Sequence, residues 1–362
     1  MINPISQLPL LSKALKSVTL INGIVQFTAV FVGASSIALL TGKPATAAGL
    51  QFSGEFDKFS NPRSVAVDRI NGNVYVLDGS GIGSYNSNGV FLKSFTGSFG
   101  SSTGLAIDSS SNLYVADRGQ NQIFKFDSNG QSLASIGNGY FSGNLGVAVD
   151  NTGNIYVADS GSSQIDKFAA NGQFLASIGK GFGGTGNGYF SGNLGVAVDN
   201  TGNIYVADPG DTQIEKFDTN GQFLASIGNG QFGNLTGVAV DSNGKIYTTE
   251  GGSNHRVQEF AADGTFLSSF GNGYGSGQTQ LNTPQGLAAN NGIIYVADTN
   301  NNRIAVLSSN SAAQAVPEPS EMLGTILAGG AALAMRHRYR RRQQQQEMEN
   351  ANPLLGEEDS QS

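Results

Sequence analysis

Aspartate residues at regular spacing are the groups in this chain whose type and pattern could do chemistry. Two series of acidic residues each close a short apolar segment. The first series is Asp68, Asp108, Asp150, Asp199 and Asp241, with Asn290 in sixth place, and the second is Asp78, Asp117, Asp159, Asp208, Glu250 and Asp298. Rings of carboxylates could bind calcium or act in acid–base catalysis. Catalysis needs one asymmetric site, so we interpret both series as strand-end acceptors for backbone N–H groups of the following turns.

The composition excludes several other kinds of site. The 362 residues contain no Cys, which excludes a thiolate nucleophile, a disulfide framework and any Cys-ligated metal. His255 and His337 are the two histidines, too few for a three-His metal centre. No Ser or carboxylate pattern beside His255 indicates a catalytic triad, so we interpret His255 as a structural residue. We predict no catalytic residue, no metal site and no cofactor.

Charge argues against nucleic acid as a partner. Charged residues make up 13% of the chain and the formal net charge is −7. Between Leu50 and Ala315 there are 12 Lys and Arg residues against 20 Asp and Glu residues, a net charge of −8. A segment of this charge repels phosphate groups.

A repeated unit must position the acidic residues. The segment Val74–Asp78 recurs five times, with its Tyr at positions 75, 114, 156, 205, 247 and 295, so the period is near 44 residues. A period in this range is typical of four-stranded propeller blades. Pairs such as Asn171-Gly172 and Asp263-Gly264 between the third and fourth segments predict two-residue type I′ hairpins. The first segments hold only small apolar residues, as expected for strands crowded around one axis. We predict an all-β, six-bladed β-propeller of four-stranded antiparallel blades over residues 48–315.

Closure of this ring can also be predicted. The sixth unit ends at Leu307 without a fourth strand, whereas Leu50–Gly54 resembles a fourth strand placed before the first unit. Pairing the two would remove two exposed sheet edges. The prediction requires any cleavage of the N-terminus to occur before about Leu50.

Hydrophobic segments flank the propeller at both ends. Residues 1–47 combine Lys13 and Lys16, a largely apolar stretch and an A-x-A exit, which is typical of a secretory signal peptide cleaved at Ala47/Ala48. The alternative is an uncleaved N-terminal membrane anchor, since the stretch is long enough to span a bilayer. Residues 343–362 form a polar tail that we expect to be disordered.

The second flank, residues 316–342, has three parts in order. Pro317, Glu318 and Pro319 precede a short apolar span, which an arginine cluster follows: Arg336, Arg338, Arg340, Arg341 and Arg342. Basic flanks stay cytoplasmic, which would place the propeller outside the cytoplasm. The segment resembles the PEP-CTERM sorting signal. That resemblance implies export, processing by an exosortase-type transpeptidase and a place at the bacterial cell surface or in its matrix. The family's signal normally ends at the arginine cluster, whereas this chain continues.

The repeated unit resembles the NHL repeat. Ser253–Val257 reads Ser-Asn-His-Arg-Val, close to the Asn-His-Arg-Ile sequence of that family, and Asp298–Ile304 keeps the Arg. Units two to four carry Gln122, Gln164 and Gln213 at the Arg position. The resemblance implies the propeller fold, and it implies no particular activity because such propellers do many jobs.

Aromatic residues in the connections between units are the candidate binding residues. We interpret Phe141, Phe190 and Phe232 as buried wedges between adjacent blades. Tyr140, Tyr189 and Tyr274 are predicted to be more open, and flat rings beside amide side chains suit a sugar surface.

Units three and four are nearly duplicates. Gly137–Asp159 and Gly186–Asp208 are identical over 23 residues, which fits a scaffold or multivalent binder better than an enzyme. We therefore predict an exported, surface-associated, non-catalytic module that binds polysaccharide or a surface protein. It would contact the membrane through its terminal segments and use the export machinery. The alternatives are a secreted lyase or hydrolase with a site at the channel mouth, and a membrane-anchored sensory ectodomain.

Overall fold

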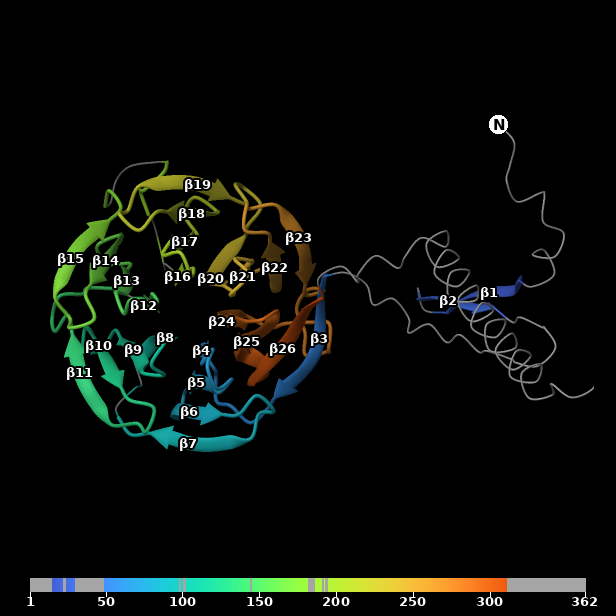
Figure 1. The fold of residues 1–362 in the computed structure, drawn as a ribbon, viewed down its shortest axis with the longest axis horizontal. Coiled ribbons are helices and arrows are strands. Elements are labelled where there is room, and N and C mark those ends of the chain that lie inside the picture. Colours follow the sequence, from blue (N-terminus) through green and yellow to red (C-terminus); the bar gives the residue numbers. More distant parts are fainter. Residues whose placement is uncertain are drawn as a thin grey trace, which may run out of the picture. The chain divides into compact units, whose positions relative to one another are not determined.

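Six four-stranded antiparallel sheets are arranged around a central axis (Figure 1). The computed structural model describes residues 15–21, 24–29 and 49–310, apart from 98, 100, 101, 144, 182–185, 191, 193 and 194. In each sheet the first strand is innermost and the fourth outermost (Figure 1). The predicted six-bladed, all-β propeller is confirmed.

The first three blades follow one another along the chain. The first blade consists of β4 (Ser64–Val67), β5 (Val74–Asp78), β6 (Gly81–Tyr85) and β7 (Phe91–Phe95). The second consists of β8 (Ser102–Ile107), β9 (Leu113–Asp117), β10 (Gln122–Phe126) and β11 (Ser132–Ile136). The third consists of β12 (Leu145–Val149), β13 (Ile155–Asp159), β14 (Gln164–Phe168) and β15 (Phe174–Ile178).

The last three blades include the two ends of the ring. The fourth blade consists of β16 (Gly195–Val198), β17 (Ile204–Asp208), β18 (Gln213–Phe217) and β19 (Phe223–Ile227). The fifth consists of β20 (Asn234–Val240), β21 (Ile246–Gly251), β22 (Arg256–Phe260) and β23 (Phe266–Phe270). The sixth consists of β24 (Pro284–Asn290), β25 (Ile293–Asp298), β26 (Arg303–Asn310) and β3 (Gly49–Phe56), with a 3₁₀ turn at Thr299–Asn301.

Burial on both faces explains the apolar second strands. In β13, Ile155 and Val157 pack in a cluster with the second blade, while Tyr156 and Ala158 pack in a cluster with the fourth. All four side chains are fully buried. A strand covered on both faces has no polar side to alternate with. The hydrophobic core is therefore a series of layers between neighbouring blades.

The hairpins between third and fourth strands differ from the predicted type I′ turns. That turn needs positive φ at both central residues, yet at Asn88-Gly89 only the glycine has it, with φ of 78°. Gly89 N–H donates to the Asn86 carbonyl, and the register between β6 and β7 shifts at Tyr85. The connection is thus a longer turn that ends in a glycine bulge. The predicted hairpins are confirmed at these places, but the predicted type I′ turn is wrong.

Close approach of backbones explains the small residues of the innermost strands. Gly286 N–H donates to the Arg63 carbonyl at 3.0 Å across the junction of the sixth and first blades. A Cβ atom at Gly286 would lie 2.8 Å from that same oxygen. Glycine is therefore required where adjacent first strands meet.

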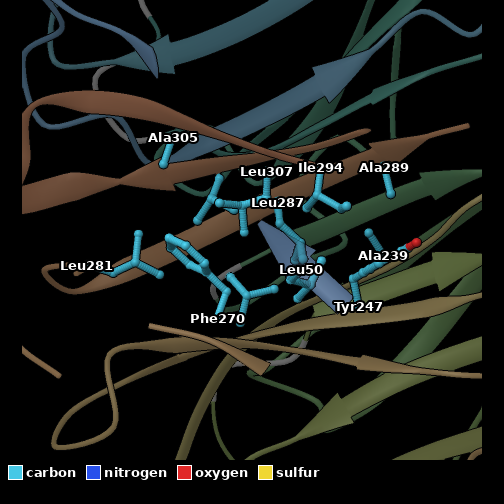
Figure 2. Packing of buried hydrophobic residues seen from close by; sticks show 12 residues of the cluster. Leu50, Ala239, Tyr247, Phe270, Leu281, Leu287, Ala289, Ile294, Ala305 and Leu307 are labelled. Carbon is cyan, nitrogen blue, oxygen red and sulfur yellow. The ribbon is translucent and has the colours of Figure 1, made fainter. Parts of the chain in front are cut away.

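Strand β3 closes the ring, as predicted. It pairs antiparallel with β26, from Phe56 opposite Ile304 to Gly49 opposite Asn310, so that segments 250 residues apart share one sheet. In Figure 1, blue β3 lies beside orange β26. Figure 2 shows Leu50 of this strand packed with Phe270 of the fifth blade and Leu287 of the sixth. The closing strand therefore contributes both a sheet edge and core.

Two short strands lie within residues 1–47. β1 (Leu15–Ile21) pairs antiparallel with β2 (Ile24–Ala29). They belong to a different compact unit from the propeller, which spans Thr46–Ser311. Within the described residues, no helix is long and apolar enough to cross a membrane. The predicted cleavage residues Ala47 and Ala48 and the segments 316–342 and 343–362 lie outside the described residues.

Arg303 provides a test of the closure. Its guanidinium donates to Asp298 Oδ2 and to Glu55 Oε2 of β3, both at 2.7 Å, and Asp298 is fully buried. We expect Arg303→Gln to lower the free energy of unfolding by about 3 kcal/mol, because it leaves a buried carboxylate without its cation. Urea unfolding of the full chain measures this loss. The exposed Arg118→Gln control should change stability by less than about 0.5 kcal/mol, and equal effects of the two variants would contradict this role for Arg303.

Candidate functional site

The central channel has an apolar waist. Two cavities of about 610 and 350 Å³ lie along the axis, and one ring of buried aliphatic side chains lines both of them. The ring consists of Val65, Leu105, Val147, Val196, Val238 and Leu287. An aliphatic ring cannot donate or accept a proton or bind a metal ion. The ring itself, where the two cavities meet, is therefore an apolar constriction of the channel.

Polar side chains at the smaller cavity bond to one another. Arg69, from the turn between β4 and β5, donates to the Val240 carbonyl at 2.7 Å and to Asn200 Oδ1 at 3.1 Å. Asn200 Nδ2 donates to the Ser242 carbonyl, and the Ser242 hydroxyl donates to Asn291 Oδ1. Arg69 thus links the first blade to the fourth and fifth across the mouth of the channel. Sequence reasoning missed it, although the other blades carry Ser or Asn at this position.

The first series of Asp residues is used within the turns. Asp150 Oδ1 accepts the N–H groups of Thr152 and Asn154, both at 2.9 Å, and its Oδ2 accepts the Tyr156 hydroxyl at 3.1 Å. Burial, followed by the charge of Asp150, raises the pKa of Tyr156. Burial works against ionisation of Asp150, but hydrogen bonds from the side chains and N–H groups of Thr152 and Asn154 outweigh it and lower the pKa of Asp150. The interpretation of these residues as acceptors for turn N–H groups is confirmed.

Tyrosine and lysine complete this repeated arrangement. The hydroxyl–carboxylate contact of Tyr156 recurs in the second, fourth and fifth blades, at Tyr114, Tyr205 and Tyr247. Lys167 Nζ lies 5.2 Å from the centroid of the Tyr156 ring, within the range of a cation–π contact. The conserved pattern of the repeat is therefore structural.

His255 also has a structural role. It lies in the connection between β21 and β22 and is 8% exposed. Its Nδ1 accepts the N–H of Thr283 at 3.0 Å, from the connection that leads into β24. The imidazole therefore ties the fifth blade to the start of the sixth, in agreement with the sequence interpretation.

The Arg-to-Gln replacement in the middle blades leaves an acidic cluster in the fourth blade. Arg256 Nε donates to buried Glu250 at 2.6 Å in the fifth blade, whereas Gln213 stands at the corresponding place in the fourth. There, carboxylate oxygens of Asp208, Asp211 and Glu215 lie within 4.8 Å of one another. Carboxylates at this spacing could hold a cation. The sequence analysis predicted no metal site and did not single out Asp211 or Glu215.

Contacts of Glu215 define the chemistry of this cluster. The side chain is fully buried, its Oε2 accepts the N–H of Gly188 at 2.7 Å, and its Oε1 accepts Gln213 Nε2 at 3.0 Å. Burial, with the charges of Asp208 and Asp211, raises the pKa of Glu215 to about 7. The third blade has Asp166 and Ser162 where the fourth has Glu215 and Asp211. A comparison of these two near-identical repeats could have found the cluster.

The three predicted tyrosines lie in three different connections and do not form one site. Tyr140 precedes β12 and is 52% exposed, and Tyr274 precedes β24 and is 68% exposed. Tyr189 is half-buried, with Lys180 Nζ 5.1 Å from the centroid of its ring. None of the three lines either cavity of the channel.

The predicted phenylalanine wedges are confirmed. Phe141, Phe190 and Phe232 are buried, and each belongs to a cluster that joins two adjacent blades. The predicted sorting residues lie outside the described residues: Pro317, Glu318, Pro319, Arg336, Arg338, Arg340, Arg341 and Arg342.

Comparison with known proteins identifies the repeat. The sequence model of the NHL repeat matches residues 145–168, 232–260 and 281–307, in the third, fifth and sixth blades. The chain therefore carries NHL repeats in a six-bladed β-propeller. No curated protein sequence gives a significant match.

Solved structures of low sequence identity share the fold. A protein of unknown function from Bacteroides thetaiotaomicron is 14% identical, with a TM-score of 0.59 over 81% of this chain and 83% of its own. A streptogramin B lyase is 15% identical, with a TM-score of 0.51 over 72% and 98%. A gluconolactonase from Xanthomonas campestris is 15% identical, with a TM-score of 0.51 over 74% and 97%. At these identities the likeness concerns the fold alone.

Glu215 makes the stability of the propeller depend on pH. Its pKa of about 7 in the folded chain exceeds the ordinary value of 4.5, so the folded state holds this proton longer than the unfolded state. Stability should fall by on the order of 3 kcal/mol as pH rises from about 4.5 to about 7. We expect Glu215→Gln to remove this fall, as measured by urea unfolding at pH 5 and pH 8.

Asp127→Asn is the matched control with the opposite sign. Hydrogen bonds from turn N–H groups, first that of Gln131, lower the pKa of Asp127. Its contribution to stability is present above the ordinary pKa of Asp and is lost as pH falls through the lowered value. An unchanged pH profile in Glu215→Gln would contradict the burial-based shift.

Proposed function

We propose that this chain is an exported, surface-associated NHL-repeat propeller that acts as a non-catalytic binding or scaffold module. Its partner would be an extracellular polysaccharide or a surface protein. The observation that carries the proposal is the apolar waist of the channel, together with the use of the repeated polar groups inside turns and blade junctions. Polar residues of the larger cavity, among them Arg63, Thr236 and Gln285, and the outer surface of loops and outermost strands remain for recognition.

The rival function is that of a secreted lyase or hydrolase. Two of the structures with this fold are named as a streptogramin B lyase and a gluconolactonase. An enzyme needs unlike polar groups that converge on the reacting atoms. The aliphatic ring of the channel, which includes Val65, Leu105 and Val147, argues against a convergent set of polar groups at that depth. Turnover of a lactone or a streptogramin by the purified full chain would contradict the non-catalytic role.

Export is supported by the order of the sequence elements and by the position of β3. The closing strand begins at Gly49, directly after the proposed cleavage at Ala47/Ala48. Cleavage there would leave intact the strand on which ring closure depends. The proposed partners in this pathway are the export machinery and an exosortase-type transpeptidase that recognises Pro317, Glu318 and Pro319.

Membrane contact would occur through the terminal segments before processing. The final location would be the bacterial cell surface or its matrix. A retained N-terminal anchor would instead favour the sensory ectodomain. The net charge of −8 over Leu50–Ala315 continues to argue against a nucleic-acid partner.

The termini of the protein from its native envelope and medium test this proposal. We expect intact-mass measurements to give an N-terminus near Ala48 and a C-terminus near Pro317–Pro319, because both segments are read as processing signals. A full-length mass confined to the inner membrane would contradict export and tail processing.

A further inference from the structure

An exposed aromatic patch lies on the outer rim of the third blade. The Tyr140 ring lies 5.5 Å from the Phe174 ring of the outermost strand β15, with 37° between the planes. Tyr140 is 52% exposed and Phe174 is 42% exposed, and the next residue, Leu175, is 47% exposed. We call these three residues the rim platform. Tyr140 and Phe174 are more than 30 positions apart, so only the fold brings these two rings together, and Leu175 follows Phe174 along β15.

Buried rings hold the platform in place. Tyr140 makes edge contacts with Phe141 at 5.7 Å and with Phe168 at 5.9 Å, and both of these residues are 2% exposed. Phe168 also makes an edge contact with Phe174 at 5.6 Å. The exposed rings are therefore fixed by the core before any ligand arrives. A fixed aromatic surface loses little conformational entropy on binding.

The exposed Phe-Leu pair of the outermost strand recurs as Phe91-Leu92, Phe223-Leu224 and Phe266-Leu267 in the first, fourth and fifth blades, but among the described residues no exposed tyrosine lies against it there. Lys180 lies over Tyr189, the counterpart of Tyr140 in the fourth blade, and Gln231 stands at the corresponding place before the fifth. Tyr274 is more exposed than Tyr140, but its ring contact among the described residues is with His255. Tyr140 is thus exposed and packed against other aromatic rings, whereas Tyr274 is exposed without such phenylalanine contacts among the described residues.

Polar groups beside the platform favour a ligand with hydroxyl groups. The exposed Ser177 lies two residues beyond Leu175 and donates to Asp166 Oδ1 at 2.6 Å. Asp166 also acts electrostatically on the Tyr140 hydroxyl. Apolar faces of a sugar ring suit aromatic rings, while its hydroxyls suit the Tyr and Ser hydroxyls at the edge. The patch therefore has both features that a pyranose needs.

The charge of the propeller and the exposed area of the platform limit the class of partner that could bind there. The net charge of −8 over Leu50–Ala315 disfavours polyanions. The exposed parts of two aromatic rings and a Leu amount to on the order of 250 Å². That is well below the roughly 800 Å² that each partner buries in a specific protein interface. A neutral polysaccharide, which can bind weakly at one blade, fits better than a protein.

We propose that the rim platform of Tyr140, Phe174 and Leu175 binds neutral polysaccharide through its exposed aromatic faces. This inference rests on the proposed binding function and assigns it a ligand class and a site. Binding there leaves the channel unused.

Affinity electrophoresis of the full chain tests the proposal. The probes are the neutral polysaccharides laminarin, pullulan and hydroxyethylcellulose, with alginate as the anionic comparison. We expect at least one neutral probe to retard the wild-type protein and alginate to leave its mobility unchanged. Tyr140→Ala should weaken binding roughly 10-fold, because it removes the aromatic face. Tyr140→Phe should keep most of the affinity, and Leu133→Ala, at an exposed apolar residue of the outermost strand β11, should bind as the wild type does.

Each other result would overturn a defined part of the inference. Wild-type binding to a neutral probe that Tyr140→Ala does not weaken would overturn the site, while the proposed binding function would stand. Retardation by alginate alone would overturn the ligand class. Retardation by none of the neutral probes would overturn the inference as a whole and leave a surface protein as the partner to seek. Thermal unfolding of Tyr140→Ala within a few degrees of the wild type shows that a loss of binding is not a loss of folding.

Discussion

Closure of the ring by β3 is the interaction on which the rest of the structure depends. Each blade covers the faces of its neighbours, so an open ring would expose two sheet faces and two edges at once. Pairing of β3 with β26 removes the gap, and Leu50 and Phe56 add buried side chains on its two sides. Arg303 joins the same strand to Asp298 and to the connection before β24. The inner glycines, such as Gly286, can approach neighbouring backbones only because this ring is complete.

The fold could be predicted because its determinants are local and repeated. Six copies of one strand pattern, glycine at the hairpins and a displaced closing strand are all visible in the order of residues. Features that depend on distant residues could not be predicted. Tyr140, in the connection before β12, contacts Phe174 of β15, and Arg69 of the first blade donates a hydrogen bond to Asn200 of the fourth across the channel. The predicted type I′ turns were wrong because the turn is longer and ends in a glycine bulge, and a further extra residue lies on the fourth strand; the Asn-Gly pair alone reveals neither.

Differences between blades carry the functional information, since the shared residues are used by the fold. The strand-end Asp residues accept hydrogen bonds from the turns, the second-strand Tyr residues of the second to fifth blades donate to those Asp residues, and the connection Phe residues pack in the core. Against that background three departures stand out. Arg69 links the first blade to the fourth and fifth at one mouth of the channel, Glu215 lies with Asp208 and Asp211 in the fourth blade, and Tyr140 exposes an aromatic face to water. The first two lie at the channel end or in the interior, whereas the third is accessible to a large ligand on the rim.

Hydrogen–deuterium exchange of the full chain, with and without laminarin, tests most directly whether ligands bind at the rim rather than in the channel. Mass spectrometry would follow the amides of each segment. We expect laminarin to slow exchange in residues 137–143 and in β15 and to leave the innermost strands β4, β8, β12, β16, β20 and β24 unchanged. Slower exchange at the residues that line the channel, with none at the rim of the third blade, would contradict this assignment.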